Sequence, residues 1–243
     1  MRHELNLNGD WRFQPDLGGE GEAGRWFAAD YNPRHWQTVR LPAPFDDCPP
    51  GLRAWEGTVW FRRSVQVPAD WTGRRIVLRF EAVNYHARVW VDGRQVGVNE
   101  DGFLPFEFDV TDLLESGADG IIVLAADNRR RAGDVPGLKR GWRPFGGILR
   151  DVKLLAADPL AIRNVQIRAD ADGALDIETT VLNSQKTSAA CELSVEVLDS
   201  EGGTAVALDP RRLQLAGGKA ASVRMRTSIA GARPWSPEDP VLY

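Results

Sequence analysis

The chain has 243 residues, of which 43% are hydrophobic and 26% are charged, and its formal net charge at pH 7 is -4. These values are ordinary for a globular protein, and the length suffices for one large domain or two ordinary ones. The charge balance provides no basic stripe to neutralise phosphates, so we expect no nucleic-acid partner. No segment approaches the ~18 consecutive apolar residues of a membrane span, and residues 1–9 lack the apolar centre of a signal peptide. We therefore expect no membrane partner, and either a cytoplasmic location or a leader that has been removed.

The cysteines and histidines are too few and too scattered for a metal site. The two cysteines, Cys48 and Cys191, lie far apart in the sequence, and the three histidines stand at positions 3, 35 and 86. This spacing matches neither a metal-ligand pattern nor a disulfide framework. We expect neither a metal ion nor another cofactor.

Apolar and polar residues alternate with a period of two through most of the first 155 residues, which predicts strands. The run 59–67 places four apolar residues on one face, and Pro68 ends it because proline lacks a ladder donor. Asp92-Gly93 predicts a two-residue hairpin turn between the next pair of strands. Strands are expected at 59–67, 76–83, 87–91, 94–98, 106–110, 121–126 and 148–155. No long apolar stripe with a 3.6-residue period occurs, so long helices are not expected.

A linker is predicted around residues 157–160, because the composition changes there. Eight of the nine tryptophans precede it, and only Trp235 follows. The later residues form alternating runs separated by glycine-containing turns, which is typical of an immunoglobulin-like sandwich of about seven strands. Cys191 falls on the apolar face of one run, where we expect a small buried hydrophobic side chain.

Seven segments of this chain follow one another in a characteristic order. They are Leu7–Phe13, Trp36–Pro42, Gly57–Arg63, Asn84–Gly93, Asp101–Phe106, Gly146–Val152 and Trp235–Tyr243. In this order they resemble the amino-terminal half of glycoside hydrolase family 2, which includes β-galactosidases, β-glucuronidases and β-mannosidases. The resemblance covers essentially the whole chain.

The resemblance implies an all-β chain with two domains. Residues 1–157 would form a jelly-roll, galactose-binding-like β-sandwich, which is the sugar-binding domain of the family. Residues 158–243 would form an immunoglobulin-like β-sandwich. In the family a catalytic (β/α)8 barrel follows, and we expect it to be absent from this chain.

The function implied by the resemblance is that of the non-catalytic portion of a β-glycosidase, which hydrolyses O-glycosyl bonds. The chain would shape the rim of the substrate site and pack on the missing barrel. Its ligand would be a β-glycoside in the context of the full enzyme, with β-galactosides and β-glucuronides both open. Two alternatives remain, namely an autonomous carbohydrate-binding module and a structural or homo-oligomerisation element that uses sheet edges.

No catalytic residues are predicted within the chain itself. Retaining glycoside hydrolysis needs two carboxyl groups roughly 5–5.5 Å apart, and adjacent carboxylates on a strand point to opposite faces. A barrel takes roughly 250 residues and alternates strands with helices, for which the chain has neither the length nor the periodicity. We expect the complete protein to be a glycoside hydrolase and this chain alone to be inactive.

Candidate substrate contacts lie in two loops. The loop 44–57 is too long for a tight hairpin, and long loops on rigid scaffolds often carry contacts. The second loop precedes Gly146-Gly147, and Gly141 stands where the family has a substrate-contacting aspartate. The candidate binding residues are Asp46, Asp47, Trp55, Arg140, Trp142 and Arg143. An exposed tryptophan can stack on the apolar face of a sugar ring.

The remaining aromatic and basic residues are interpreted as structural. We expect Trp11, Trp36, Trp60 and Trp90 to pack in the core or between domains. The one tight basic run, 129–131, is interpreted as a solvated loop face.

Overall fold

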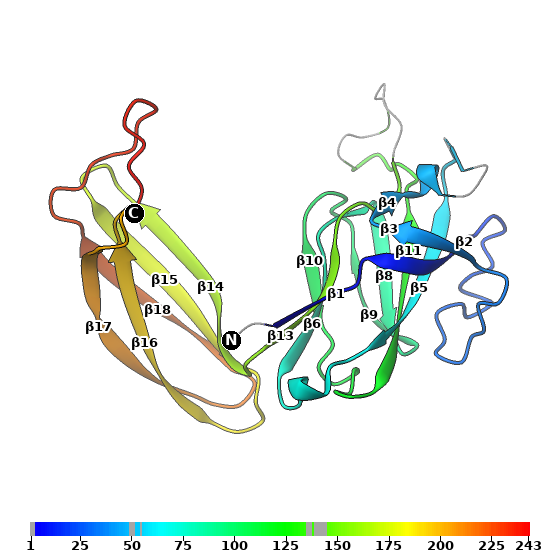
Figure 1. The fold of residues 1–243 in the computed structure, drawn as a ribbon, viewed down its shortest axis with the longest axis horizontal. Helices are drawn as coiled ribbons and strands as arrows, with labels where there is room; N and C mark the ends of the chain where they lie inside the picture. Colours follow the sequence, from blue (N-terminus) through cyan, green and yellow to red (C-terminus); the bar gives the residue numbers. More distant parts are fainter. Residues whose placement is uncertain (1–2, 49–51, 54, 135–137, 139–144) are drawn as a thin grey trace. The chain divides into compact units, whose positions relative to one another are not determined.

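The computed structural model describes residues 3–48, 52–53, 55–134, 138 and 145–243. In this part of the chain the regular structure consists of strands and two single-turn 3-10 helices, Phe45–Asp47 and Ala69–Trp71. Contacts divide the chain into two compact units, Met1–Ala157 and Asp158–Tyr243. The prediction of an all-β chain with two β-sandwiches is confirmed (Figure 1).

The described residues of the first unit form two large antiparallel sheets and one small sheet (Figure 1). The first sheet has the order β1 (His3–Asn6), β13 (Val152–Ala157), β6 (Arg75–Phe80) and β10 (Phe106–Asp109). The second has the order β3 (Gln37–Leu41), β2 (Gly9–Pro15), β5 (Thr58–Gln66), β11 (Asp119–Asp127), β8 (His86–Val91) and β9 (Arg94–Asn99). The small sheet has the order β4 (Ala43–Pro44), β12 (Gly147–Ile148) and β7 (Val83–Asn84). The predicted Asp92-Gly93 turn joins β8 to β9, and both residues have positive φ.

The core of the first unit lies between the two large sheets. Phe13 and Phe61, which are cross-strand partners on β2 and β5, meet edge to face with their ring centroids 5.4 Å apart. The outer face of the six-stranded sheet carries a second aromatic cluster, built on Trp36, Trp60 and Trp90. The four tryptophans expected in the core, at positions 11, 36, 60 and 90, are at most 4% exposed, so that prediction is confirmed.

The segment that covers this outer cluster is held by a buried arginine. Arg62 on β5 is 5% exposed, and its guanidinium donates to the carbonyls of Ala28 and Ala29 at 2.9 and 2.8 Å. Burial lowers the pKa of Arg62 below its ordinary value, and nearby Tyr31 and Asp30 partly oppose that shift. The side chain therefore anchors the loop by hydrogen bonds to its backbone carbonyl groups.

The second unit contains five strands of 10 to 12 residues in place of the seven expected. One sheet has the order β14 (Leu160–Ala169), β15 (Ala174–Asn183) and β18 (Lys219–Ser228), and the other pairs β16 (Ala189–Leu198) with β17 (Thr204–Leu215). Pro210 lies inside β17, at a register shift against β16. A bulge tolerates proline, so one long strand forms across this position.

Candidate functional site

The small sheet brings together three loops that are far apart in the sequence. Gly147 of β12 pairs with Pro44 on one side and with Asn84 on the other. Beside it, the N–H of Phe45 donates to the carbonyl of Gly146 at 2.8 Å. A Cβ atom on Gly146 would lie 2.2 Å from the Phe45 ring, so only glycine permits this approach. The loop after β4, the turn after β7 and the segment before β12 therefore share one region of the first unit.

Asp46 and Asp47 lie in the 3-10 helix that opens the loop after β4. Phe45 anchors this helix because its ring is fully buried, while Asp46 is half-buried and Asp47 is exposed. Burial raises the pKa of the Cys48 thiol to about 11, and the carboxylates of Asp47 and Asp46 add to that effect. The helix thus presents two carboxylates beside a neutral thiol.

Trp55 packs on the same helix and is not fully exposed. Its half-buried ring meets Phe45 edge to face, with the centroids 5.9 Å apart. Asn128, which follows β11 and is 0% exposed, donates from Nδ2 to the Trp55 carbonyl at 3.1 Å. The Oδ1 atom of Asn128 accepts from the N–H of Gly57 at 2.8 Å. One buried amide therefore fixes the far end of the loop to the six-stranded sheet.

Three of the six predicted contact residues, Arg140, Trp142 and Arg143, lie outside the described residues. The segments that flank them are described. Asp134 precedes them and contacts His86, and Phe145 follows them and contacts Asn84.

Asn84 is one residue of this region that was not predicted from the sequence. It is 1% exposed, and its Nδ2 donates to the carbonyl of Phe145 at 2.6 Å. Its Oδ1 is buried and accepts no hydrogen bond from the described residues. Gly102 approaches so closely that a Cβ atom there would lie 2.5 Å from this oxygen. The sequence feature that could have identified Asn84 is its position as a polar residue directly after the apolar residues Ala82 and Val83.

His86 connects two further loops to the start of β8. Its ring is 8% exposed, with Nε2 3.4 Å from the Asp134 carboxylate and Nδ1 3.6 Å from the Glu100 carboxylate. Arg131 reinforces this arrangement, because its backbone N–H donates to Asp134 at 2.7 Å and its guanidinium lies 3.7 Å from Glu100. Acidic and basic groups from two loops, one after β9 and one after β11, therefore surround one imidazole.

The basic run 129–131 is not simply solvated, so that interpretation was wrong for its central residue. The Arg130 side chain is 16% exposed and lies 3.7 Å from Glu56. Arg129 and Arg131 are more exposed, and both pair with Asp127. Burial by itself would raise the pKa of Asp127, but hydrogen bonds from the Arg129 side chain and backbone outweigh it and lower that pKa.

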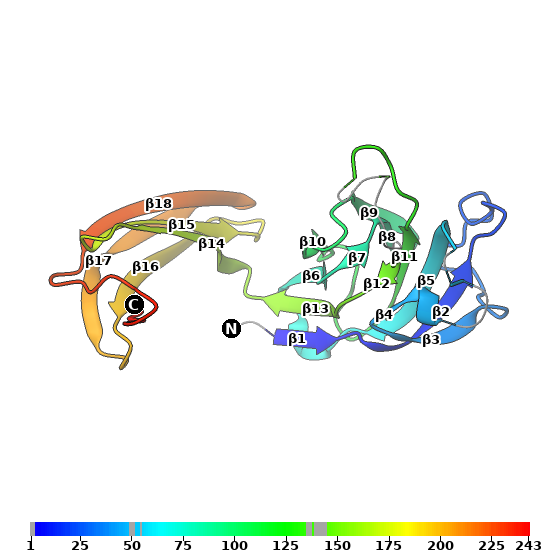
Figure 2. The ribbon, with the colours of Figure 1, turned by 90° about the horizontal axis from the view of Figure 1, so that it is seen from above.

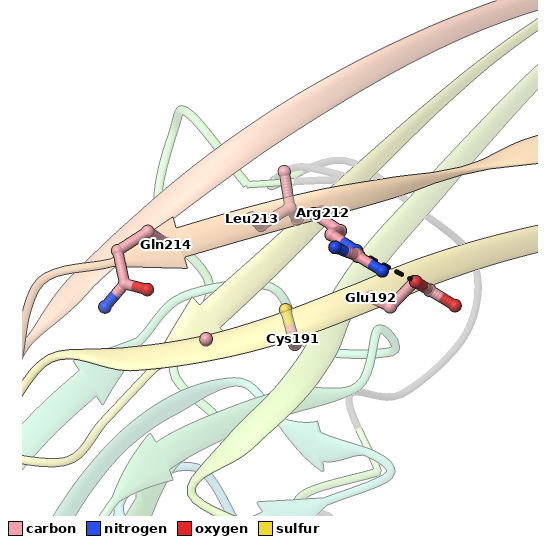
Figure 3. A pocket seen from close by; sticks show the side chains of 6 residues that line it. Cys191, Glu192, Arg212, Leu213 and Gln214 are labelled. Carbon is pink, nitrogen blue, oxygen red and sulfur yellow. Dashed lines mark hydrogen bonds and ion pairs between the residues drawn. The ribbon is translucent and has the colours of Figure 1, made fainter.

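Two surface hollows lie elsewhere in the described residues. One, of about 400 Å³, lies on the outer face of the six-stranded sheet and is lined by Asp10, Trp11, Arg12, Thr38, Arg62, Arg63 and Ser64. The other, of about 430 Å³, is lined by residues of β16 and β17 around Cys191, with the Glu192–Arg212 ion pair beside them (Figure 3). Neither hollow includes a predicted contact residue.

The described residues contain no group of three histidine, cysteine, aspartate or glutamate side chains arranged to hold a metal ion. No helix in this part of the chain is long and apolar enough to cross a bilayer. The chemistry near the small sheet is instead that of hydrogen bonding. Amide, carboxylate and imidazole groups converge there beside the rings of Phe45, Trp55 and Tyr85. Such a mixture suits a hydroxyl-rich ligand with an apolar ring face.

Two family models together match nearly the whole chain. Residues 5–158 match the sugar binding domain of glycosyl hydrolases family 2, and residues 160–243 match a second family 2 model. The chain belongs to glycosyl hydrolase family 2. The resemblance drawn from the ordered segments is therefore confirmed, and Asn84, His86 and the loop after β4 all fall within the family's sugar-binding domain.

The curated relatives of this family 2 chain include proteins named β-glucuronidase and proteins named β-galactosidase. A β-glucuronidase of Formosa agariphila is 27% identical over the whole chain, which corresponds to 27% of that protein. A β-galactosidase of Thermoanaerobacter pseudethanolicus is 26% identical over the whole chain and 32% of its own length. The crystal structure of a Bacteroides uniformis β-glucuronidase superimposes with a TM-score of 0.85 at 22% identity, over 99% of this chain and 29% of that one. This family 2 chain thus spans roughly a third or less of these relatives.

Proposed function

We propose that this chain is the non-catalytic amino-terminal portion of a β-glycosidase of the β-glucuronidase or β-galactosidase type. In this proposal the region around the small sheet forms part of the rim of the substrate site. A catalytic barrel, which these residues do not contain, packs against that rim and supplies the acid/base and nucleophile carboxyl groups. The relatives support the activity class, because both activities occur among proteins that match the whole chain.

The observation that carries the rim proposal is the Oδ1 atom of Asn84. A buried carbonyl oxygen without a donor costs free energy, typically about 1–3 kcal/mol, so native structures keep few of them. The Nδ2 atom of the same side chain is held by the carbonyl of Phe145, which fixes the orientation of the amide. A sugar hydroxyl group is a suitable donor for the remaining oxygen.

The surrounding groups extend this contact in a way that suits a sugar. Asp46 and Asp47 stand at the start of the loop after β4, where their carboxylates can accept hydrogen bonds from further hydroxyl groups. Trp55 offers an aromatic edge, and the buried His86 lies between two carboxylates. These groups bind and orient the substrate, and the bond-breaking step belongs to the barrel.

The first test measures turnover and binding with the purified chain. We expect no hydrolysis of 4-nitrophenyl β-D-glucuronide or β-D-galactoside, because the chain supplies only a rim. We also expect no response of tryptophan fluorescence to oligosaccharides at micromolar concentrations. Turnover by the pure chain would contradict the non-catalytic assignment, and micromolar binding would favour the alternative of an autonomous carbohydrate-binding module.

The second test measures the steady-state kinetics of an Asn84 variant of the complete enzyme, barrel included. Asn84→Ala should lower kcat/KM by roughly 10- to 100-fold, the effect expected for loss of one or two hydrogen-bond interactions with substrate. Asn164→Ala, at an exposed position on β14 in the second unit, is the matched control and should leave kcat/KM unchanged. Equal kinetics for both variants would refute the role proposed for Asn84.

A further inference from the structure

Strands β3, β2 and β5 lie side by side in the six-stranded sheet of the first unit (Figure 2). The ladder between β2 and β5 is short, because it joins residues 12–15 of β2 only to residues 59–62 of β5. Beyond it, residues 9–11 continue along β3 and residues 63–66 continue along β11. The two strands therefore run past each other without hydrogen bonds at this end of their pairing.

The surface hollow of about 400 Å³ lies where these two strands part. Its lining comes from both strands next to the end of their ladder, with one residue from β3. The lining residues are Asp10, Trp11, Arg12, Thr38, Arg62, Arg63 and Ser64. This volume is at the lower end of the range for small-molecule sites, so it suits a ligand of about the size of a monosaccharide.

The hollow carries an excess of positive charge. Three of its lining residues are arginines, and Asp10 supplies its one carboxylate. Within the described residues, the three guanidinium groups donate only to backbone carbonyl groups and to the hydroxyl group of Thr38. None of these arginines is therefore neutralised by an ion pair there, in a chain whose formal net charge is -4.

Two of the arginines face each other across the end of the ladder. Arg12 on β2 and Arg62 on β5 are register partners, and like charges at directly opposite positions are destabilising. Arg62 is buried and held by the loop carbonyls described above, so it cannot turn away. Burial also lowers the pKa of Arg63, with nearby Asp10 opposing that shift. An anion in the hollow would offset both costs.

Arg63 is held so that part of its guanidinium group remains free. Its Nη1 atom donates to the carbonyls of Asn8 and Asp10, each at 3.1 Å. The group lies over the Trp11 ring, with its central carbon 5.9 Å from the ring centroid. The Nε and Nη2 atoms have no acceptor among the described residues, so they can donate to a ligand.

Arg12 is held in a similar way on the neighbouring strand. Its Nη1 atom donates to Thr38 Oγ1 at 3.2 Å and to the carbonyl of Trp36 at 3.4 Å. Its Nε and Nη2 atoms have no acceptor among the described residues, and the exposed hydroxyl group of Ser64 makes no hydrogen bond to them either. A planar guanidinium group with free N–H groups matches the two oxygens of a carboxylate.

We propose that this hollow binds a small hydroxylated carboxylate, such as a free sugar acid. Arg12 and Arg63 donate to the carboxylate group of the ligand, and Arg62 adds positive charge from the buried side. The hydroxyl groups of Thr38 and Ser64 provide further polar contacts. The site is separate from the small sheet, so the proposal does not depend on the rim.

The lining favours a sugar acid over other small ligands. A neutral sugar would leave the arginines without a counter-charge, and it would find no stacking surface because Trp11 is 1% exposed and lies beneath Arg63. Asp10 accepts hydrogen bonds from hydroxyl groups, which a simple carboxylate such as acetate lacks. Its charge also disfavours inorganic sulfate, which carries more negative charge than a carboxylate.

The test is a titration of the purified full chain, followed by nuclear magnetic resonance of the backbone amides of residues 10–12 and 62–64. The ligands are D-glucuronate, D-glucose, acetate and inorganic sulfate, at constant ionic strength. We expect saturable shifts with D-glucuronate, and binding at least roughly tenfold weaker for each of the other three. These amides differ from those of Asn84 and residues 45–48, so the result is independent of sugar binding at the rim.

Arg12→Gln should weaken the binding of D-glucuronate by roughly tenfold or more, because it removes charge-assisted hydrogen bonds. The side chain is exposed, so the variant should fold, and urea denaturation checks this. Arg40→Gln is the matched control, since Arg40 is exposed on the neighbouring β3 and does not line the hollow. It removes the same charge nearby and should change the affinity by less than about twofold.

Three results would overturn the proposal. The first is the absence of saturable shifts at these amides with D-glucuronate up to about 50 mM. The second is equal binding of D-glucuronate and either acetate or sulfate, because the hollow would then attract anions by charge alone. The third is an equal loss of affinity in Arg12→Gln and Arg40→Gln, because the effect would then belong to the whole face of the sheet.

Discussion

Replacing Asn128 by alanine should release the loop that carries three of the predicted contact residues. The side chain is completely buried and makes two bonds to that loop, with the N–H of Gly57 at 2.8 Å and the carbonyl of Trp55 at 3.1 Å. Alanine leaves both backbone groups without this partner. At about 1–3 kcal/mol for each group left unpaired, and with partial relaxation of the loop, the free energy of unfolding should fall by about 3 kcal/mol.

The assay for Asn128→Ala is urea denaturation of the full chain followed by tryptophan fluorescence. A loss of about 3 kcal/mol corresponds to a fall in melting temperature of roughly 6–12 °C for a chain of this size. Asn99→Ala removes a single bond at an exposed site and serves as the matched control, with an expected change within about 0.5 kcal/mol. If Asn128→Ala also changes stability by less than that amount, the buried amide does not hold the loop.

Three further predictions concern packing and ionisation in the first unit. Gly146→Ala should destabilise the chain by about 1–3 kcal/mol in the same assay, because its Cβ atom would clash with Phe45, whereas Gly133→Ala meets no atom within 4 Å and should be neutral. The Cys48 thiol has its pKa raised to about 11 from 9.0, so its contribution to stability is complete below pH 9 and is lost as the pH rises through 11. Thiol alkylation against pH should show that midpoint, and a midpoint near 9 would contradict it. Arg62→Met should make the segment over the outer aromatic cluster susceptible to limited proteolysis, and an unchanged digestion pattern would refute its anchoring role.

The features that depend on local pattern were predictable from the sequence. Alternation indicated the strands, and Asp92-Gly93 indicated a turn that the structure contains with positive φ at both residues. Trp60 and Trp90 were assigned to core or inter-domain packing because they lie in the segments that resemble the family, and both are at most 4% exposed. Each of these features is determined by residues that are close to one another in the sequence.

The features that depend on register between distant segments were not predictable. Asn84 gains its role from the pairing of β7 with β12, which brings together residues about sixty positions apart. The Arg130 side chain is 16% exposed and lies 3.7 Å from Glu56, and a basic run alone gives no sign of that distant partner.

The most direct test of the proposed rim is nuclear magnetic resonance of the Asn84 side-chain amide in the purified chain. Methyl β-D-glucuronide and methyl β-D-galactoside are titrated to high concentration, since half of a binding site should bind no more tightly than about 1 mM. We expect one of these sugars to shift the Asn84 amide and the backbone amides of residues 45–48, and Asn84→Ala to abolish the shifts at 45–48. Shifts confined to the second unit, or none with either sugar, would contradict it.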